Sequence, residues 1–142
     1  MKRSVALRSL SREHHQALTI AQELRRTDDP ERAAARFHEF WRREGALHFR
    51  IEEEVLLPTW ELLGTVDAEA AARLAREHLE LRTAALALGD EPPLAAVREL
   101  GDNLAAHVRF EERELFPLIE ADLGTAELEH LARAVAEAEG SQ

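Results

Sequence analysis

We expect an all-α protein: an antiparallel up-down-up-down four-helix bundle with a short C-terminal fifth helix. Ala, Leu, Glu and Arg dominate the composition, and aromatic residues make up only 5%. These residues favour helices, whereas strands favour β-branched and aromatic residues. Apolar residues also recur with a helical period, and the breaks between periodic segments are short, which is typical of an antiparallel bundle. The 142 residues suit a single domain, 1–142, with the bundle over about 4–123.

Turn and breaker residues divide the chain into helices, for which we expect the approximate ranges 4–26, 30–62, 67–88, 92–123 and 126–139. Asp29 can cap the second helix, and Pro30 suits the first position of that helix. Asp67 can cap the third helix. We expect the second helix to bend near Pro58, because proline removes a helical hydrogen bond.

Composition excludes several classes of function. The formal net charge is −10, so the chain is a poor partner for nucleic acid or an anionic membrane, which are polyanions. Cysteine is absent, which excludes disulfides and thiolate-bound metals. No apolar stretch approaches the length of a membrane span, and the first residues do not resemble a signal peptide. We therefore expect a soluble, cytoplasmic protein.

Two motifs occur twice. HFRIEEEVLLP at 48–58 returns as HVRFEERELFP at 107–117, an offset of 59 residues (107 − 48). REH at 12–14 returns at 76–78, an offset of 64 residues (78 − 14). The first two helices thus look like a loose duplicate of the next two. Two such halves packed face to face would form a site with pseudo-two-fold symmetry.

Helical phase places one histidine on the inward face of each long helix: His14, His48, His78 and His107. Glu52 and Glu111 follow two of these histidines by four residues and share their faces. His15 lies one step off the inward stripe of the first helix, so the HH pair leaves a one-residue ambiguity: phase favours His14, and His15 is the alternative.

Metal ions explain this polar interior. A carboxylate buried without a partner is strongly unfavourable or becomes protonated. Neutral imidazole is a common metal ligand, and a carboxylate can bridge two cations about 3.5–4 Å apart. The competing interpretation is a polar core without metal that specifies how helices pair. The combination of four in-phase histidines and two in-phase glutamates favours the metal site.

These motifs resemble those of the hemerythrin-like domain, also called the HHE cation-binding domain. The resemblance covers residues of about 10–123 and rests on four segments, REHH at 12–15, HFRIEEEVLLP at 48–58, REH at 76–78 and HVRFEERELFP at 107–117. It implies a four-helix bundle around a non-haem, carboxylate-bridged pair of iron ions. Carried over by position, it implies the following metal ligands: His14 and His48 on one iron, His78 and His107 on the other, and Glu52 and Glu111 as bridges.

The chain departs from the oxygen-carrying hemerythrins at one position. Those proteins have a further histidine one turn before the third-helix ligand, where this chain has Leu74. Leucine cannot bind iron, so the resemblance implies two similar, more symmetric iron sites with open positions. This puts reversible oxygen carriage in doubt as the main role. The remaining pattern is similar to the metal-binding domain of di-iron proteins linked to iron–sulfur cluster repair and nitric oxide stress, although their cysteine-containing segment is absent.

Three further glutamates lie close to the predicted ligands. Glu53 and Glu112 each follow a bridging candidate and point about 100° away, so we expect surface residues or partners of the ligands. Glu44 lies one turn before His48 and is a minor candidate for an extra ligand.

The leading hypothesis is a di-iron protein that binds or senses oxygen or nitric oxide, or handles iron. The alternatives are a di-iron redox enzyme (an oxidase, a peroxidase-like catalyst or a nitric oxide reductase) and a metal-free helical interaction module. The sequence identifies no protein partner and no separate substrate pocket.

Overall fold

The computed structural model describes residues 2–140, which contain helices and no strand. The predicted all-α class is confirmed. The helices have the bounds α1 Val5–Arg26, α2 Pro30–Phe40, α3 Ala46–Ile51, α4 Leu57–Leu63, α5 Ala68–Ala87, α6 Leu94–Phe110, α7 Phe116–Asp122 and α8 Thr125–Gly140. None of the described helices is long and apolar enough to cross a membrane.

Short π-helical turns join several of these helices into longer rods. The turns η1 (Trp41–Gly45) and η2 (Glu52–Leu56) link α2, α3 and α4 into one rod over 30–63. The turn η3 (Glu111–Leu115) links α6 and α7 into a rod over 94–122. Together with α1 and α5 these rods match the four long predicted helices, and α8 matches the predicted fifth.

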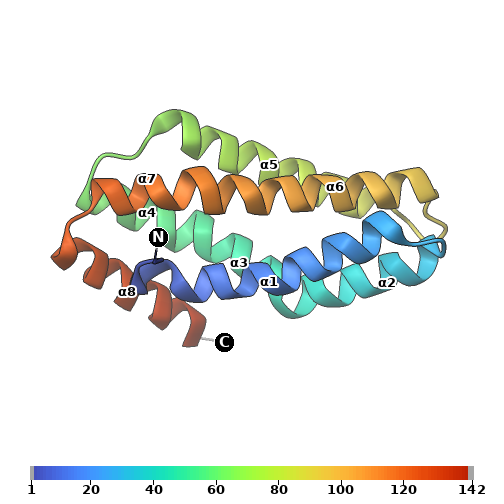
Figure 1. Ribbon diagram of the computed structural model, residues 1–142, viewed down its shortest axis with the longest axis horizontal. Helices are drawn as coiled ribbons and strands as arrows, with labels where there is room; N and C mark the ends of the chain where they lie inside the picture. The colour runs from blue at the N-terminus through green and yellow to red at the C-terminus, as the bar shows by residue number, and fades with distance from the viewer. Residues whose placement is uncertain (1, 141–142) are drawn as a thin grey trace.

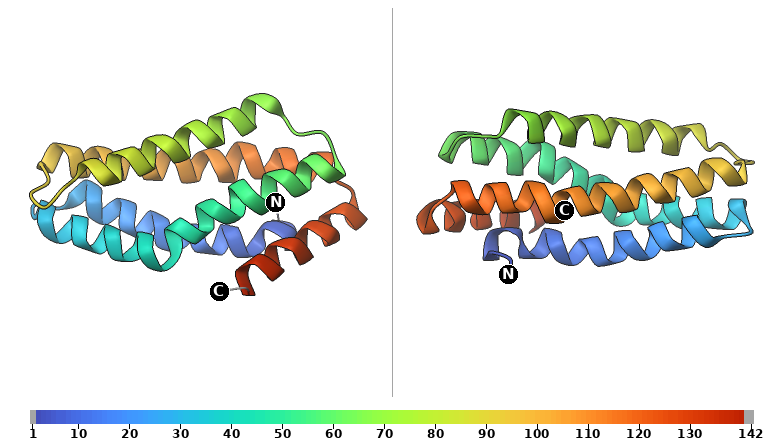
Figure 2. Two further views of the ribbon diagram at one scale, coloured as in Figure 1. Left: turned by 180° about the vertical axis from the view of Figure 1, so that it is seen from behind. Right: turned by 45° about the horizontal axis from the view of Figure 1, so that its top comes forward.

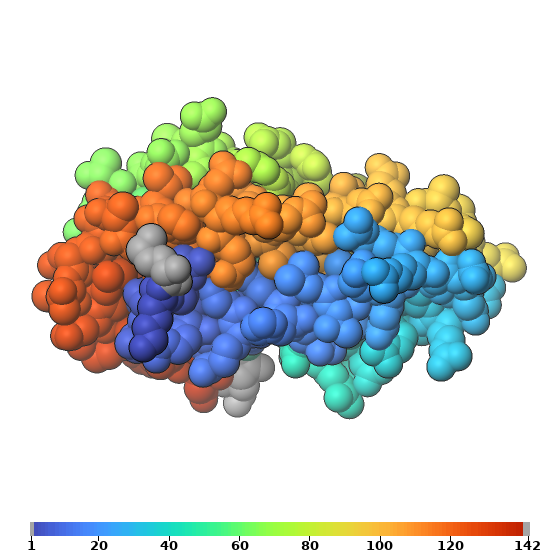
Figure 3. Space-filling view, viewed as in Figure 1, coloured from blue at the N-terminus to red at the C-terminus, as the bar shows by residue number. Residues whose placement is uncertain are grey.

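The rods lie side by side, and the chain reverses direction between successive rods (Figure 1). Helix α1 packs along α6, and α5 also packs against α6. Figure 2 shows the rod of α2, α3 and α4 on the far side of α1 in the view of Figure 1. Helix α8 turns back along the outside and contacts α1 and α4. In the space-filling view, side chains of α1 and of the α6–α7 rod meet along most of their length (Figure 3).

Local sequence signals explain where the rods begin. The side chain of Asp29 accepts a hydrogen bond from the backbone N–H of Arg32 at 3.1 Å, and Pro30 occupies the first turn of α2. Asp67 caps α5 in the same way, at 2.8 Å from the N–H of Ala70. These two predicted caps are therefore present.

The π-helical turns were not predicted. Each inserts a hydrogen bond to the carbonyl five residues earlier, as from the Leu57 N–H to Glu52 and from the Phe116 N–H to Glu111. A proline follows η2 and η3 within two residues (Pro58 and Pro117), whereas no proline follows η1 within that distance. Proline has no N–H and its ring crowds the carbonyl four residues before it, so a widened turn relieves the conflict. A π-turn that starts at Glu52 thus lies just before Pro58, and the bend predicted there stays a prediction.

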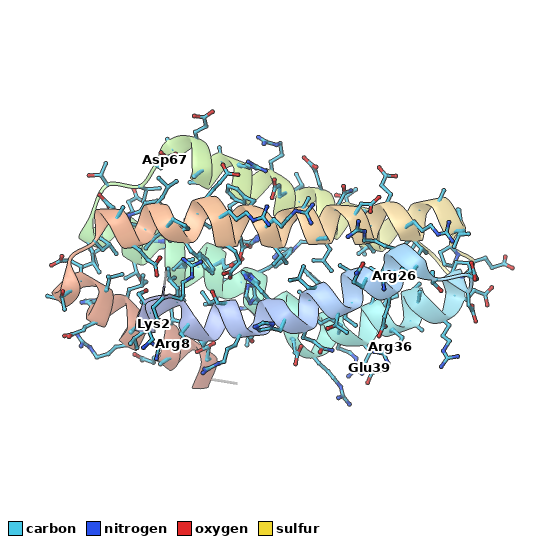
Figure 4. All side chains as sticks on the ribbon, viewed as in Figure 1. Lys2, Arg8, Arg26, Arg36, Glu39 and Asp67 are labelled. Atoms are coloured by element: carbon cyan, nitrogen blue, oxygen red, sulfur yellow. The ribbon has the colours of Figure 1, made fainter. Side chains whose placement is uncertain are left out.

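Two apolar clusters fill the interior. The first gathers α2 with the adjoining halves of α1, α5 and α6, around Phe37, Leu24 and Leu100. The second gathers α4, α7 and α8 with the other halves, around Trp60 and Phe116. The polar side chains at the predicted site occupy the layer between the two clusters. Charged side chains such as Arg36 and Glu39 point outward (Figure 4).

Candidate metal centre

All six predicted ligands are buried, and the buried polar residues among the described ones are these same six: His14, His48, Glu52, His78, His107 and Glu111. Both glutamates have no solvent exposure, and the histidines are at most 8% exposed. His15 is exposed, so the helix-1 side chain that enters the interior is His14, as helical phase predicted. Glu44 is exposed as well.

These side chains form two groups that could each hold one ion. We define position A as the group of His14, His48, Glu52 and Glu111, and position B as the group of His78, His107, Glu52 and Glu111. The ligand atoms within each group lie within 4.8 Å of one another. Both positions contain the same two glutamates, so a shared bridge requires no rearrangement of the helices.

Each shared carboxylate directs one oxygen to each position. Glu52 has Oε2 at 3.0 Å from His48 Nε2 and Oε1 at 3.1 Å from His78 Nε2. Glu111 has Oε1 at 2.8 Å from His14 Nε2 and Oε2 at 2.7 Å from His107 Nε2. The arrangement repeats the pseudo-two-fold pattern of the duplicated motifs.

The donor atoms fit a pair of cations. Within residues 2–140, four buried atoms at position B have no hydrogen-bond partner, namely Glu52 Oε1, His78 Nε2, His107 Nε2 and Glu111 Oε2. They are close to one another, but the directions of their contacts do not suit hydrogen bonds. Buried polar atoms without partners are costly, whereas lone pairs that converge on one point suit a metal ion.

A second set of four glutamates holds the outer nitrogens of the imidazoles. The Nδ1 atoms lie 2.5–3.0 Å from carboxylate oxygens, in the pairs His14–Glu112, His48–Glu13, His78–Glu53 and His107–Glu77. An Nδ1–H that donates to a carboxylate leaves the Nε2 lone pair free for a metal. These Nδ1 contacts would favour the tautomers that a metal pair requires.

These contacts form a closed circuit around the rods. Each rod contributes an inward ligand and, next to it in sequence, a glutamate that reaches the histidine of another rod. Glu13 of α1 contacts the second rod, Glu53 of η2 contacts α5, Glu77 of α5 contacts α6, and Glu112 of η3 contacts α1. The placement of the predicted metal ligands is thereby linked to the packing of all four rods.

Three of these four glutamates are also bound by an arginine. Arg82 donates to Glu53 at 2.7 Å, Arg73 to Glu77 at 2.7 Å, and Arg3 to Glu112 at 3.1 Å. Each arginine also lies over an aromatic ring: Arg82 over Phe49 and Trp41, Arg73 over Phe110, and Arg3 over Phe116. Phe49 and Phe116 in turn stack on His78 and His14.

The carboxylates change the acid–base behaviour of the imidazoles. Burial alone lowers the pKa of a histidine, but hydrogen bonds to Glu111 and Glu112 raise the pKa of His14 to about 9. Burial also lowers the pKa of His78 and His107, but the nearby carboxylates of Glu111 and Glu52 raise the pKa of His78 to about 9, and the charge of Glu111 raises that of His107 to about 10. Burial would raise the pKa of Glu111, yet His107 holds it well below its usual range. Cations that bind at Nε2 would displace protons.

A small cavity lies beside the centre. It has a volume of about 20 Å³, and its lining includes His14, His48, His107, Phe49 and Trp41. A water-sized molecule needs about 10–15 Å³ of such space, so the cavity has room for one very small guest. Its walls are mostly apolar.

Fold and site together define a helical cation-binding domain with paired histidine–carboxylate positions. Comparison with known families gives the same answer: residues 5–119 match the hemerythrin HHE cation binding domain, and the chain belongs to that family. The matched range covers the four rods up to Ile119 and includes all six predicted ligands. Searches of curated proteins and of solved structures give no match.

The contacts of Glu13 and Glu77 with His48 and His107 were not predicted from the sequence. Both precede a predicted ligand within the repeated REH motif, so the signal was present: a glutamate retained in both halves beside the histidine. Glu53 and Glu112 were expected as surface residues or partners of ligands, and they contact His78 and His14. The assignment of the six ligands themselves stays a prediction until a metal is measured.

Proposed function

We propose that this chain is a non-haem di-iron protein built on an antiparallel up-down-up-down four-helix bundle. One iron would bind at position A through His14 and His48, and the other at position B through His78 and His107. Glu52 and Glu111 would bridge them. The observation that supports this most directly is that the two oxygens of each buried glutamate face different histidine pairs.

We further propose that the iron pair binds or senses a small diatomic molecule, oxygen or nitric oxide. Each position offers two imidazoles and two carboxylate oxygens, which leaves coordination positions free. A bound iron pair would supply redox chemistry and Lewis acidity at those positions. The cavity of about 20 Å³ beside His14, His48 and His107 suits a guest of about diatomic size.

Titration of the anaerobic ferrous protein with nitric oxide tests this proposal. We expect a saturable change in the visible and electron paramagnetic resonance spectra that reverses when the gas is removed. Protein stripped of iron serves as the control. Iron-loaded protein whose spectra do not change with nitric oxide or with oxygen would contradict a diatomic ligand and leave iron handling as the role.

The free coordination positions also favour a second candidate, a di-iron redox enzyme. Steady-state consumption of oxygen, peroxide or nitric oxide in the presence of a reductant separates the two functions. Sustained turnover that depends on iron would support the enzyme. Binding at the stoichiometry of the centre without turnover would support a carrier or sensor. The cytoplasmic location predicted from the sequence remains a prediction.

A further inference from the structure

We propose that the two positions hold their metals unequally and that the metal at position A is the exchangeable one. This inference rests on the proposed di-iron function and concerns which half of the centre loads and releases iron. Both positions have the same ligand types, so the difference comes from their surroundings. Three independent features of the described residues indicate the same half.

The first feature is how firmly the imidazoles are held. At position B both supporting glutamates are bound by arginines, Glu53 by Arg82 and Glu77 by Arg73. At position A the Glu112 carboxylate is bound by Arg3 and by Ser11 at 2.7 Å. The other supporting carboxylate at position A is that of Glu13.

Glu13 supports His48 without such help. Its Oε1 lies 3.0 Å from His48 Nδ1, the longest of the four supporting contacts. The contacts recorded for Glu13 within residues 2–140 include no arginine. Loss of a supporting partner weakens metal binding by about 10–100-fold. A supporting carboxylate that no arginine holds in place should weaken metal binding by part of that amount.

The second feature is the hydrogen bonding of the ligand atoms when no metal is bound. At position A, His14 Nε2 hydrogen-bonds Glu111 Oε1 at 2.8 Å and His48 Nε2 hydrogen-bonds Glu52 Oε2 at 3.0 Å. At position B, the equivalent atoms lie equally close, with His107 Nε2 at 2.7 Å from Glu111 Oε2 and His78 Nε2 at 3.1 Å from Glu52 Oε1, but the directions of these contacts do not suit hydrogen bonds. A departing metal therefore leaves well-directed hydrogen bonds at position A and poorly directed contacts at position B, which favours release from A.

The third feature is access. His14 and His48 are 4% and 8% exposed, whereas His78 and His107 are 0% and 2% exposed. The cavity is lined by both histidines of position A and by Glu13, but by only one histidine of position B. Water and small ligands would therefore reach position A more readily.

Release of iron from the ferrous protein tests this inference. Anaerobic protein loaded with two irons is mixed with a large excess of a coloured ferrous chelator, and the absorbance is followed. We expect two phases of one iron per chain each, whose rates do not depend on chelator concentration. The slow phase should be on the order of 10-fold or more slower than the fast phase.

Two single-position variants assign the phases. His48→Ala disrupts position A, so its remaining iron should leave at the slow rate. His107→Ala disrupts position B at the equivalent place in the duplicate, so its remaining iron should leave at the fast rate. The reverse assignment, or a single phase for both irons of the unmodified protein, would overturn the inference while leaving the di-iron function intact.

Arg73→Gln provides a test that does not touch a ligand. Arg73 is partly exposed and holds Glu77, so its loss should speed the slow phase toward the fast one by about 10-fold and leave the fast phase unchanged. Arg50→Gln is the matched control, because Arg50 forms an exposed i,i+4 pair with Glu54 away from the centre. An unchanged slow phase in Arg73→Gln would contradict the argument from the arginines.

The two proposals fail in different ways. Ferrous protein that never retains two irons per chain would overturn the di-iron function and this inference with it. Protein that retains two irons and releases both at one rate would overturn only the inference. Circular dichroism of each variant, before and after iron removal, establishes that the rates refer to folded protein.

Discussion

Glu111 is, together with Glu52, one of the two residues on which both positions depend. Its Oε1 lies near His14 and its Oε2 near His107, whereas His107 itself belongs to position B alone. The glutamate is fully buried and its pKa is held well below the usual range, since nearby imidazoles outweigh the effect of burial. Its removal should therefore affect the centre differently from removal of one histidine.

We predict that Glu111→Ala lowers bound iron to less than one per chain, because both positions lose a ligand. His107→Ala should retain one iron, at position A. Glu54→Ala, which removes an exposed carboxylate two residues from Glu52, should keep two irons. Elemental analysis of the three proteins provides the comparison. Equal iron loss in Glu111→Ala and His107→Ala would argue against a bridging role.

Ala17 provides a test of the cavity. Its methyl group lines the cavity beside His14 and is 7% exposed. Leucine at this place would fill the space, and making room for a guest would then cost about 1–3 kcal/mol. We predict that Ala17→Leu weakens nitric oxide binding about 10-fold or more without changing iron content. Ala35→Leu, at an exposed place on α2, is the control; equal binding by both variants would exclude the cavity as the ligand site.

The direction in which a side chain points could be predicted from the sequence where it depends on a single helix. The phase of α1 alone places His14 inward and His15 outward, and the structure agrees. It did not find Glu13 and Glu77, because each lies one residue off the inward stripe of its own helix. Their contacts depend on how neighbouring rods are rotated about their axes, which a single helix does not specify.

Among the helical elements, too, some features could be predicted from the sequence and others could not. The beginnings of α2 and α5 follow from Asp29 and Asp67, whose side chains act within three residues of sequence. The π-turns could not be predicted in this way, because spacings of four residues between inward positions also occur in regular α-helices. Two of them, η2 and η3, start at the two shared carboxylates, Glu52 and Glu111.

We predict that Pro117→Ala weakens iron binding with little change in the stability of the metal-free protein. Alanine restores an N–H, so the chain can return to a regular α-helical turn that moves Glu111 out of place. The added hydrogen bond of about 1 kcal/mol offsets the greater freedom of the unfolded chain. Chelator competition and urea unfolding measure the two effects, with Pro30→Ala as the control. Unchanged iron affinity would show that packing alone maintains the π-turn.

At the scale of the whole molecule, the centre links all four rods. The six ligands and their four supporting glutamates come from α1, the second rod, α5 and the fourth rod. The polar layer separates two apolar clusters, so its contacts control how these clusters pack together. Metal binding should therefore stabilise the entire fold rather than one segment.

We predict that each iron, at 100 times its dissociation constant, raises the free energy of unfolding by about 3 kcal/mol. For a chain of this length the melting temperature should rise by roughly 5–10 °C for each iron. Calorimetry with and without chelator measures this, and Glu111→Ala should show no rise. A melting temperature that chelator does not change would favour the interpretation as a metal-free interaction module.

The central claim is a pair of irons, and metal content tests it most directly. Protein purified without a metal-affinity tag from iron-replete cells should be assayed for all transition metals, together with its visible spectrum. The account predicts two irons per chain, one for each group of ligands, with charge-transfer absorption from a carboxylate-bridged ferric pair. A single metal ion, zinc, or no metal would contradict it.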